Sequence, residues 1–138
     1  MWKQIFHLFK KESLTDEAFK EAIIMLKASQ IMFTDAVASL REKGSLEYDI
    51  YERDRQINKY ERDVRRKIVT HLAISQNPDA NHALVLTAIV IDIERIGDFT
   101  KNIVELAQDI PDVFDPGEID DDVSMIEDTL ASMFETII

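Results

Sequence analysis

The chain has 138 residues, of which 46% are hydrophobic, and this is enough for one domain with one packed core. It contains no cysteine, so disulfides and thiolate metal sites are excluded, and any metal ion must be held by oxygen or imidazole ligands. The net charge of -11 comes from residues 102–138, which hold 11 acidic residues and no Lys or Arg, and this balance argues against nucleic acid as a partner.

We expect residues 1–12 to form a separate N-terminal amphipathic segment. A helix there would place four apolar side chains on one face, namely Trp2, Ile5, Phe6 and Phe9. Such a segment would either bind a membrane surface or fold onto the rest of the protein. No apolar run approaches the roughly 18 residues that indicate a membrane span, and no signal peptide is recognisable. We therefore expect a cytoplasmic protein whose contact with a membrane is at most peripheral.

Glycine and proline are rare, with three of each, so they mark the ends of long helices. The first predicted helix spans about 15–43, with Ser13 or Thr15 as its N-cap and Gly44 after its end. The second has its N-cap at Ser45 and ends near Ser75. Their apolar stripes are Phe19, Ile23, Leu26, Phe33, Val37 and Leu40 in the first helix, and Leu46, Ile50, Ile57, Val64, Ile68 and Leu72 in the second.

The third predicted helix spans roughly 78–110, with Asn77 as its cap, Pro78 at its first position and Pro111 as its stop. Its broad apolar face consists of Ile89, Ile93, Ile96, Phe99 and Ile103. A fourth helix begins after Pro116 and carries an apolar face of Met125, Leu130, Met133, Phe134, Ile137 and Ile138. That face predicts a homo-oligomer, because a large apolar surface on a soluble protein usually marks an interaction site.

Short connections between helices of about 30 residues force antiparallel neighbours. We therefore predict an all-α fold: a long antiparallel three-helix bundle over residues 13–111, with a fourth C-terminal helix. Residues 112–138 supply an acidic linker and the start of that further helix.

Two stripes of oxygen-bearing side chains border the apolar faces of the second and third helices. They consist of Asp54, Asn58 and Glu61 on the second helix, and of Glu94, Asp98 and Asn102 on the third. Glu94 and Asp98 stand one turn apart with Gly97 between them, an arrangement that local helix preferences disfavour twice, once for the like charges and once for the glycine. Such penalties indicate either a neutralising neighbour or a role outside folding.

A groove rimmed by these six residues would offer carboxylate and amide oxygens to a hard cation. The alternative is a salt-bridged face, in which Arg65 pairs with Glu61, Lys101 pairs with Asp98, and Arg62 or Arg95 crosses between the helices. Spacing alone favours this alternative, because acid pairs one turn apart are common on soluble helices.

Recognisable catalytic motifs are missing from the chain. The nearest match to a Glu-x-x-His iron motif is Asp79-x-x-His82, where Asp79 is better explained by the helix dipole. There is no glycine-rich phosphate loop, no nucleophile elbow and no Ser-His-Asp set. We therefore expect a protein that is not an enzyme. Two other functions remain open: a hydrolase with a carboxylate-held di-metal centre, and a purely structural helical interaction module.

The segment "DIERIGDFTKNI" at residues 92–103 closely resembles the signature of the PhoU family of phosphate-uptake regulators, and "DRQINKYERDVRRKI" at 54–68 resembles the matching segment on the preceding helix. The resemblance covers roughly residues 15–110. It implies a three-helix bundle that binds divalent or ferric metal ions (Fe, Zn, Ni, Mg or Mn). By position, the implied metal ligands are Asp54, Asn58, Glu61, Glu94, Asp98 and Asn102.

The resemblance also implies regulation of phosphate uptake and transport through protein contacts, with a phosphate transporter or a sensor histidine kinase as the partner. Two departures from the family pattern stand out. Asn58 occupies a position where the family often has Asp, which keeps an oxygen ligand but removes a charge. The chain also has one complete repeat, where the family resembles two tandem bundles.

Overall fold

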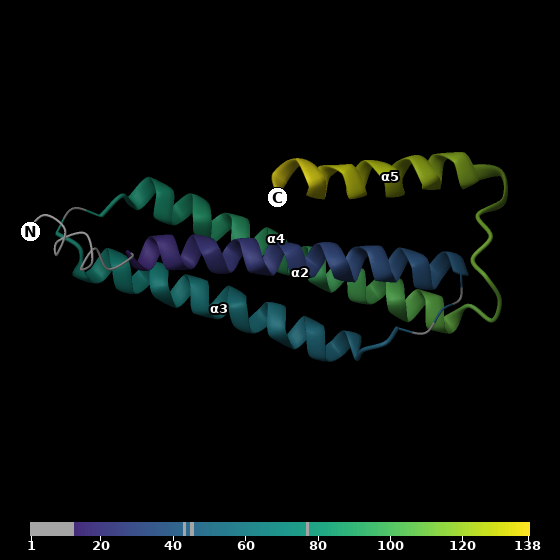
Figure 1. The fold of residues 1–138 in the computed structure, drawn as a ribbon, viewed down its shortest axis with the longest axis horizontal. Coiled ribbons are helices and arrows are strands. Elements are labelled where there is room, and N and C mark those ends of the chain that lie inside the picture. The colour runs from purple at the N-terminus through teal and green to yellow at the C-terminus, as the bar shows by residue number, and fades with distance from the viewer. Residues whose placement is uncertain (1–12, 43, 45, 77) are drawn as a thin grey trace, which may run out of the picture.

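The structure is a computed structural model of the chain, and it describes residues 13–42, 44, 46–76 and 78–138. These residues form the helices α2 (Leu14–Glu42), α3 (Ile50–Ile74), α4 (Ala80–Asp109) and α5 (Asp120–Ile137), with a short 3-10 helix, η1 (Gly117–Ile119), before α5. The first three pack as a long antiparallel bundle, and α5 runs back over one half of it (Figure 1). The predicted all-α bundle with a fourth C-terminal helix is confirmed. The predicted amphipathic segment 1–12 lies outside the described residues.

Side-chain caps set the beginning of the first two bundle helices. Ser13 caps α2 in a reciprocal pair, because its Oγ accepts from the backbone N–H of Asp16 and Asp16 Oδ2 accepts from the N–H of Ser13, both at 3.1 Å. Helix α3 begins later than predicted, and its N-cap is Asp49. The Oδ1 atom of Asp49 accepts a hydrogen bond from the backbone N–H of Tyr51 at 2.8 Å. The predicted cap, Ser45, lies outside the described residues.

Helix α4 likewise begins two residues later than predicted. Asp79 is its N-cap, and Asp79 Oδ1 accepts from the N–H of His82 at 3.1 Å. The predicted cap, Asn77, lies outside the described residues, and Pro78 precedes the helix. An aspartate carboxylate is favoured at this place because its negative charge also complements the positive end of the helix dipole.

Small side chains occupy many of the buried positions of α2 and α4. Buried positions recur at alternating spacings of three and four residues, as in a coiled coil. They are Ala18, Ala22, Met25, Ser29, Met32, Ala36 and Ser39 in α2, and Ala83, Leu86, Val90, Ile93, Gly97, Thr100 and Val104 in α4. Because the separation of packed helices depends on the side chains at their contact, these small residues favour a close approach.

This packing corrects the predicted apolar faces. Phe19, Ile89 and Phe99 were expected in the core, but they are 57%, 45% and 62% exposed. The large apolar residues on which the prediction was based lie next to the buried face of small residues, and not within it. The buried faces of α2 and α4 are therefore rotated away from these large residues, whereas the predicted stripe of α3 is buried at Ile50, Ile57, Val64 and Ile68.

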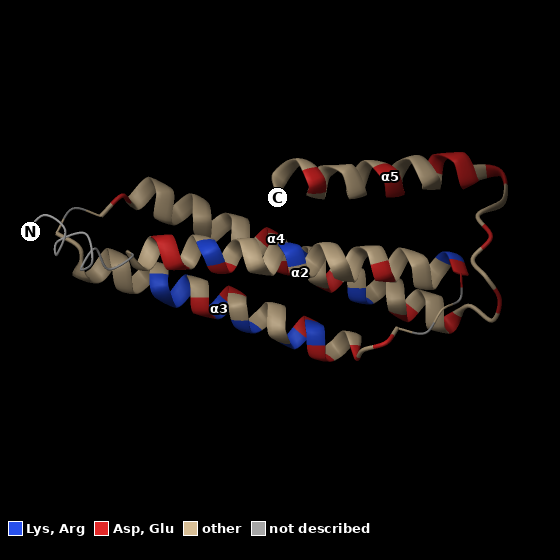
Figure 2. Ribbon diagram, viewed as in Figure 1, with Lys and Arg blue, Asp and Glu red and all other residues tan. Residues whose placement is uncertain are grey.

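Helix α2 is long and apolar enough to cross a membrane when judged by length and composition. The central helix of a soluble bundle satisfies the same test, because it is apolar on more than one side. In the structure α2 contacts both α3 and α4 along its length. Most of the Lys and Arg residues of the described helices lie on α3, and the charged residues of the linker and of α5 are all acidic (Figure 2).

Candidate metal site between α3 and α4

Helix α3 places two carboxylates among its core positions. The buried residues of α3 are Ile50, Ile57, Val64 and Ile68. Positions 54 and 61 fall on the same face, because they continue the alternating spacing of four and three residues, and they are occupied by Asp54 and Glu61. The side chains of Asp54 and Glu61 are only 14% and 12% exposed. A charge removed from water to this extent is costly unless it is paired, so both acids require a partner.

Gly97 allows α4 to approach α3 beside these acids. A Cβ atom at Gly97 would lie 3.1 Å from Ile57 Cδ1 and 3.5 Å from Ile57 Cγ2. The absence of a side chain at Gly97 therefore lets a neighbouring helix come close, and that helix is α3. Glu94 and Asp98, on either side of Gly97 in α4, are thereby brought close to the acids of α3.

The electrostatics of Glu94 show that four of the predicted ligands are neighbours. Burial raises the pKa of Glu94 above its usual range, and the negative charges of Asp98, Glu61 and Asp54 raise it further. We call Asp54, Glu61, Glu94 and Asp98 the acidic groove. Among the described residues, Glu94 makes no hydrogen bond or ion pair of its own, so its charge is compensated only at a distance.

Lys101 is the cation that joins the two sides of the acidic groove. Its Nζ donates to Asp98 Oδ1 at 2.8 Å on its own helix and to Asp54 Oδ2 at 3.3 Å on α3. The hydrogen bond to Asp98 raises the pKa of Lys101, and the charge of Asp54 raises it further against the opposing effect of burial. Lys101 therefore stays charged at neutral pH and links α3 to α4.

The two asparagines of the predicted ligand set differ in position. Asn58 lies inside the groove, where its Nδ2 donates to the backbone oxygen of Asp54 at 3.1 Å and to Asp54 Oδ2 at 3.4 Å. Asn102 is exposed on α4 and has no hydrogen-bond partner in the part of the chain that the structure describes. The structure thus gathers five of the six residues in one place and leaves Asn102 at its edge.

The donor set suits a hard cation, because carboxylate and amide oxygens are the ligands that such ions prefer. Asp54 Oδ1 is buried and accepts no hydrogen bond from the described residues. This oxygen is therefore available to coordinate a metal ion. However, no three His, Asp or Glu side chains of the described residues converge closely enough to form a finished metal site. The chemistry of the groove fits a metal ion, while Lys101 stands between its acids.

The salt-bridged interpretation of the same face also describes real contacts. Glu61 accepts from Arg65 Nη1 at 2.7 Å, and Asp98 pairs with Lys101 as that interpretation predicts. On this face the cation that connects α4 to α3 is Lys101, whereas Arg95 Nη1 lies 3.6 Å from Asp92 Oδ1 on its own helix. Sequence reasoning missed the reach of Lys101 to α3. The available signal was that Asp54 occupies a core position of α3 and therefore needs a cation from another helix.

The iron motif considered at Asp79 and His82 is a helix cap. His82 Nδ1 lies 2.7 Å from Asp79 Oδ2, and both side chains are exposed at the beginning of α4. The backbone hydrogen bond from His82 lowers the pKa of Asp79. The helix-dipole explanation of Asp79 is therefore the one that the geometry favours.

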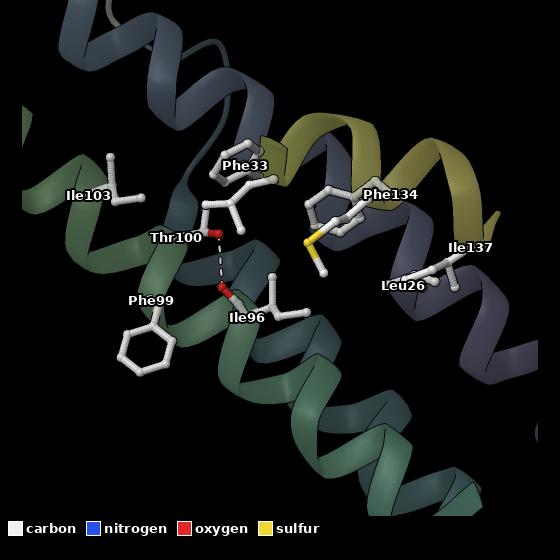
Figure 3. Close-up of a pocket in the computed structure, with 10 residues that line it drawn as sticks. Leu26, Phe33, Ile96, Phe99, Thr100, Ile103, Phe134 and Ile137 are labelled. Atoms are coloured by element: carbon white, nitrogen blue, oxygen red, sulfur yellow. Dashed lines mark hydrogen bonds between the residues drawn. The ribbon is translucent and has the colours of Figure 1, made fainter. Parts of the chain in front are cut away.

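A second feature of interest is an apolar cavity under α5. Its volume is about 250 Å³, and α2, α4 and α5 line it. Phe134 of α5 lies beside Leu26 and Phe33 of α2, while Ile96 and Thr100 of α4 lie across the gap (Figure 3). Thr100 Oγ1 donates to the backbone oxygen of Ile96 at 2.8 Å, so the wall on α4 presents no free polar group there. The cavity suits an apolar side chain.

The comparisons with known proteins agree with this geometry. The family model described as the PhoU domain matches residues 22–107, which is more than half of the chain. The match contains all of α3, all but the end of α4, and every position of the predicted ligand set. No curated protein and no solved structure matches the chain significantly. The chain belongs to the PhoU domain family.

Proposed function

We propose that this domain is a cytoplasmic, metal-binding regulator of phosphate uptake that acts through protein contacts. Membership of the PhoU domain family suggests a role in the regulation of phosphate transport, and that family is regulatory rather than enzymatic. The observation that best supports a metal ion is the buried and unpaired Asp54 Oδ1 within a groove of four carboxylates.

The acidic groove would hold the ion through Asp54 and Glu61 of α3 and Glu94 and Asp98 of α4. Asn58 would add a neutral oxygen, and Asn102 would reach the site from its edge. A bound cation would supply positive charge that neutralises the groove and ties α3 to α4. Fe, Zn, Ni, Mg and Mn are all candidates, and among them the oxygen-only donor set favours the harder ions.

The partner we propose is a phosphate transporter or a sensor histidine kinase. There are two candidate contact surfaces. One is the rim of the acidic groove, and the other is the basic face of α3 around the exposed side chains of Arg62 and Arg66. The sequence offers no phosphate-binding loop and no excess positive charge, so we propose that free phosphate is not sensed by this domain directly. A pull-down from phosphate-replete cells, with Arg62→Glu as the disrupted variant, would identify the partner.

Thermal melting with and without metal tests the proposed metal site. A ligand present at 100 times its dissociation constant should stabilise the fold by about 2.7 kcal/mol. We expect the melting temperature to rise with at least one of Mg, Mn, Fe, Ni and Zn, and we expect Asp98→Asn to remove this rise. Asp92→Asn is the matched control, because Asp92 is on the same helix and is 73% exposed outside the groove.

An unchanged melting temperature with all five metals, together with no metal in elemental analysis, would contradict this proposal. A phosphatase assay with the same metals separates the regulator from the alternative hydrolase. Turnover that is abolished by Glu94→Ala would favour the hydrolase, whereas a regulator should show none.

A further inference from the structure

The ammonium group of Lys101 lies between the acids of α3 and the acids of α4. It is hydrogen-bonded to Asp98 on one side and to Asp54 on the other, and the Lys101 side chain is 21% exposed. Asp54 itself is 14% exposed. The pair of Lys101 with Asp54 therefore differs from an ordinary surface salt bridge, which is exposed to water and contributes little to stability.

We propose that Lys101 is the built-in counter-cation of the acidic groove, and that a metal ion must displace its ammonium group from Asp54 and Asp98 in order to bind. This inference rests on the proposed metal-binding function and adds to it a mechanism that sets the affinity. It also implies that the loaded and metal-free domains differ in which cation links α3 to α4.

The charges around the groove support this assignment. From α3 come Asp54, Glu61 and Arg65, and from α4 come Glu94, Asp98 and Lys101. Arg65 is engaged with Glu61 on its own helix and is 51% exposed, so it does not bridge the helices. Of the cations on the described residues facing the groove, Lys101 alone contacts acids on both helices.

The remaining acids show why a metal ion would compete with Lys101. An ammonium group contributes one positive charge and donates hydrogen bonds, but four carboxylates lie close enough to influence one another. Glu94 and Asp54 Oδ1 are left without a hydrogen bond in the described part of the chain. A divalent cation carries twice the charge and accepts more oxygen ligands, so it can satisfy acids that Lys101 leaves unpaired.

Displacement would also change the surface of the domain. When its two carboxylates bind a metal ion, the Lys101 side chain loses both of its hydrogen-bond partners and can extend into water. The rim of the groove would then gain a free ammonium group beside a neutralised acidic site. A partner that contacts this rim would meet different charge patterns in the two states, and this gives metal binding a route to regulation.

Calorimetric titration of the full 138-residue chain with Mn²⁺ tests the proposal. Lys101→Met removes the ammonium group and should bind Mn²⁺ about tenfold more tightly than the unmodified chain, a factor that corresponds to about 1.4 kcal/mol. Lys101→Arg keeps a cation in place and should leave the affinity close to the original. Lys27→Met is the matched control, because it makes the same charge change at an exposed position of α2, which contributes no residue to the groove.

A measurement without metal provides a second readout. Removing Lys101 leaves Asp54 and Asp98 without their cation, so Lys101→Met should melt at a lower temperature than Lys27→Met in a metal-free buffer. Added Mn²⁺ should restore more stability to Lys101→Met than to the unmodified chain. Lys101→Gln, which keeps a hydrogen-bond donor without the charge, gives the same comparison if the methionine variant does not fold.

The outcomes separate this proposal from the proposed function. If the unmodified chain binds Mn²⁺ and Lys101→Met binds it equally or more weakly, the domain is a metal binder and the role of Lys101 is refuted. An equal gain in Lys27→Met would also refute it, since general charge would then be the cause. If only Lys101→Met binds Mn²⁺, the counter-cation role holds and metal binding by the natural chain is refuted. If neither binds, both are refuted.

Discussion

At the scale of single residues, Gly97 shows how one position serves the packing of two helices. A Cβ at Gly97 would meet Ile57 Cδ1 at 3.1 Å, so the neighbouring side chain would have to move by a few tenths of an ångström. Alanine gains about 1 kcal/mol of helix propensity over glycine, while overpacking costs about 1 to 3 kcal/mol. We therefore expect Gly97→Ala to be nearly neutral or mildly destabilising in denaturant titration.

Gly97→Leu should be clearly destabilising, by about 3 kcal/mol, because its branched side chain cannot fit against Ile57. Gly44 is the matched control, since nothing lies within 4 Å of a Cβ placed there. If Gly44→Leu and Gly97→Leu lowered the unfolding free energy equally, the close contact between α3 and α4 would not be the reason for the glycine.

Glu94 should make the stability of the metal-free domain depend on pH. Burial and the neighbouring acids raise its pKa in the folded state above the value for the unfolded chain. The folded chain therefore holds this proton more tightly, and the contribution of Glu94 to stability is lost as the pH rises through the raised pKa. Glu94→Gln removes the charge, so it should raise the melting temperature at pH 8 and change it little at pH 4.

We expect this gain to be roughly 1 to 3 °C, as removal of a few tenths of a kcal/mol of like-charge repulsion would give. The same variant should lose its stabilisation by metal. A Glu94→Gln domain that melted lower at pH 8 than the original would show that the carboxylate is favourably paired without metal, and not repelled by the neighbouring acids.

At the scale of the elements, α5 is held to the bundle chiefly through α2. Arg41 Nη2 donates to Glu127 Oε2 at 2.9 Å and Arg41 Nη1 donates to Asp120 Oδ1 at 2.5 Å, which joins the end of α2 to the first half of α5. Nearer the C-terminus of α5, the centroids of the Phe33 and Phe134 rings lie 5.8 Å apart. On both sides of Phe134, from Leu130 to Ile137, the apolar cavity lies between α5 and α4.

Arg41→Met should therefore loosen α5 while leaving the three-helix bundle intact. We expect faster amide hydrogen exchange in residues 120–137 and a melting temperature of the bundle that stays nearly unchanged. Arg55→Met is the matched control, because the pair of Arg55 with Glu52 lies within α3 and both side chains are more than half exposed. Unchanged exchange in α5 would mean that the contact of Phe134 alone secures this helix.

At the scale of the whole molecule, one half of the bundle carries an exposed apolar surface. Met133 and Ile137 of α5 are 52% and 60% exposed beside the cavity, and Phe99 of α4 is 62% exposed on its other side. The acidic start of α5 opposes the approach of a second acidic helix start. We therefore expect a second copy of the chain to place its α5 against this surface with the two helix starts apart.

Light scattering should then show a dimer at high protein concentration, and Met133→Lys should convert it to a monomer by placing a charge in the contact. Met125→Lys is the matched control, because Met125 is 62% exposed on the same helix but does not line the cavity. A stable monomer at every concentration would contradict this expectation. So would equal effects of the two substitutions.

The sequence by itself determined the helices and the chemistry of the groove. Rare glycines and prolines located the helix ends to within a few residues, and spacing along α3 and α4 assigned the oxygen-bearing side chains. The tertiary structure decided which faces of α2 and α4 are buried, because small residues such as Ala22 and Gly97 are buried while Phe19 and Phe99 remain exposed. It also decided that Lys101 reaches Asp54, since a contact between two helices depends on their separation and rotation, which no periodicity within one helix contains.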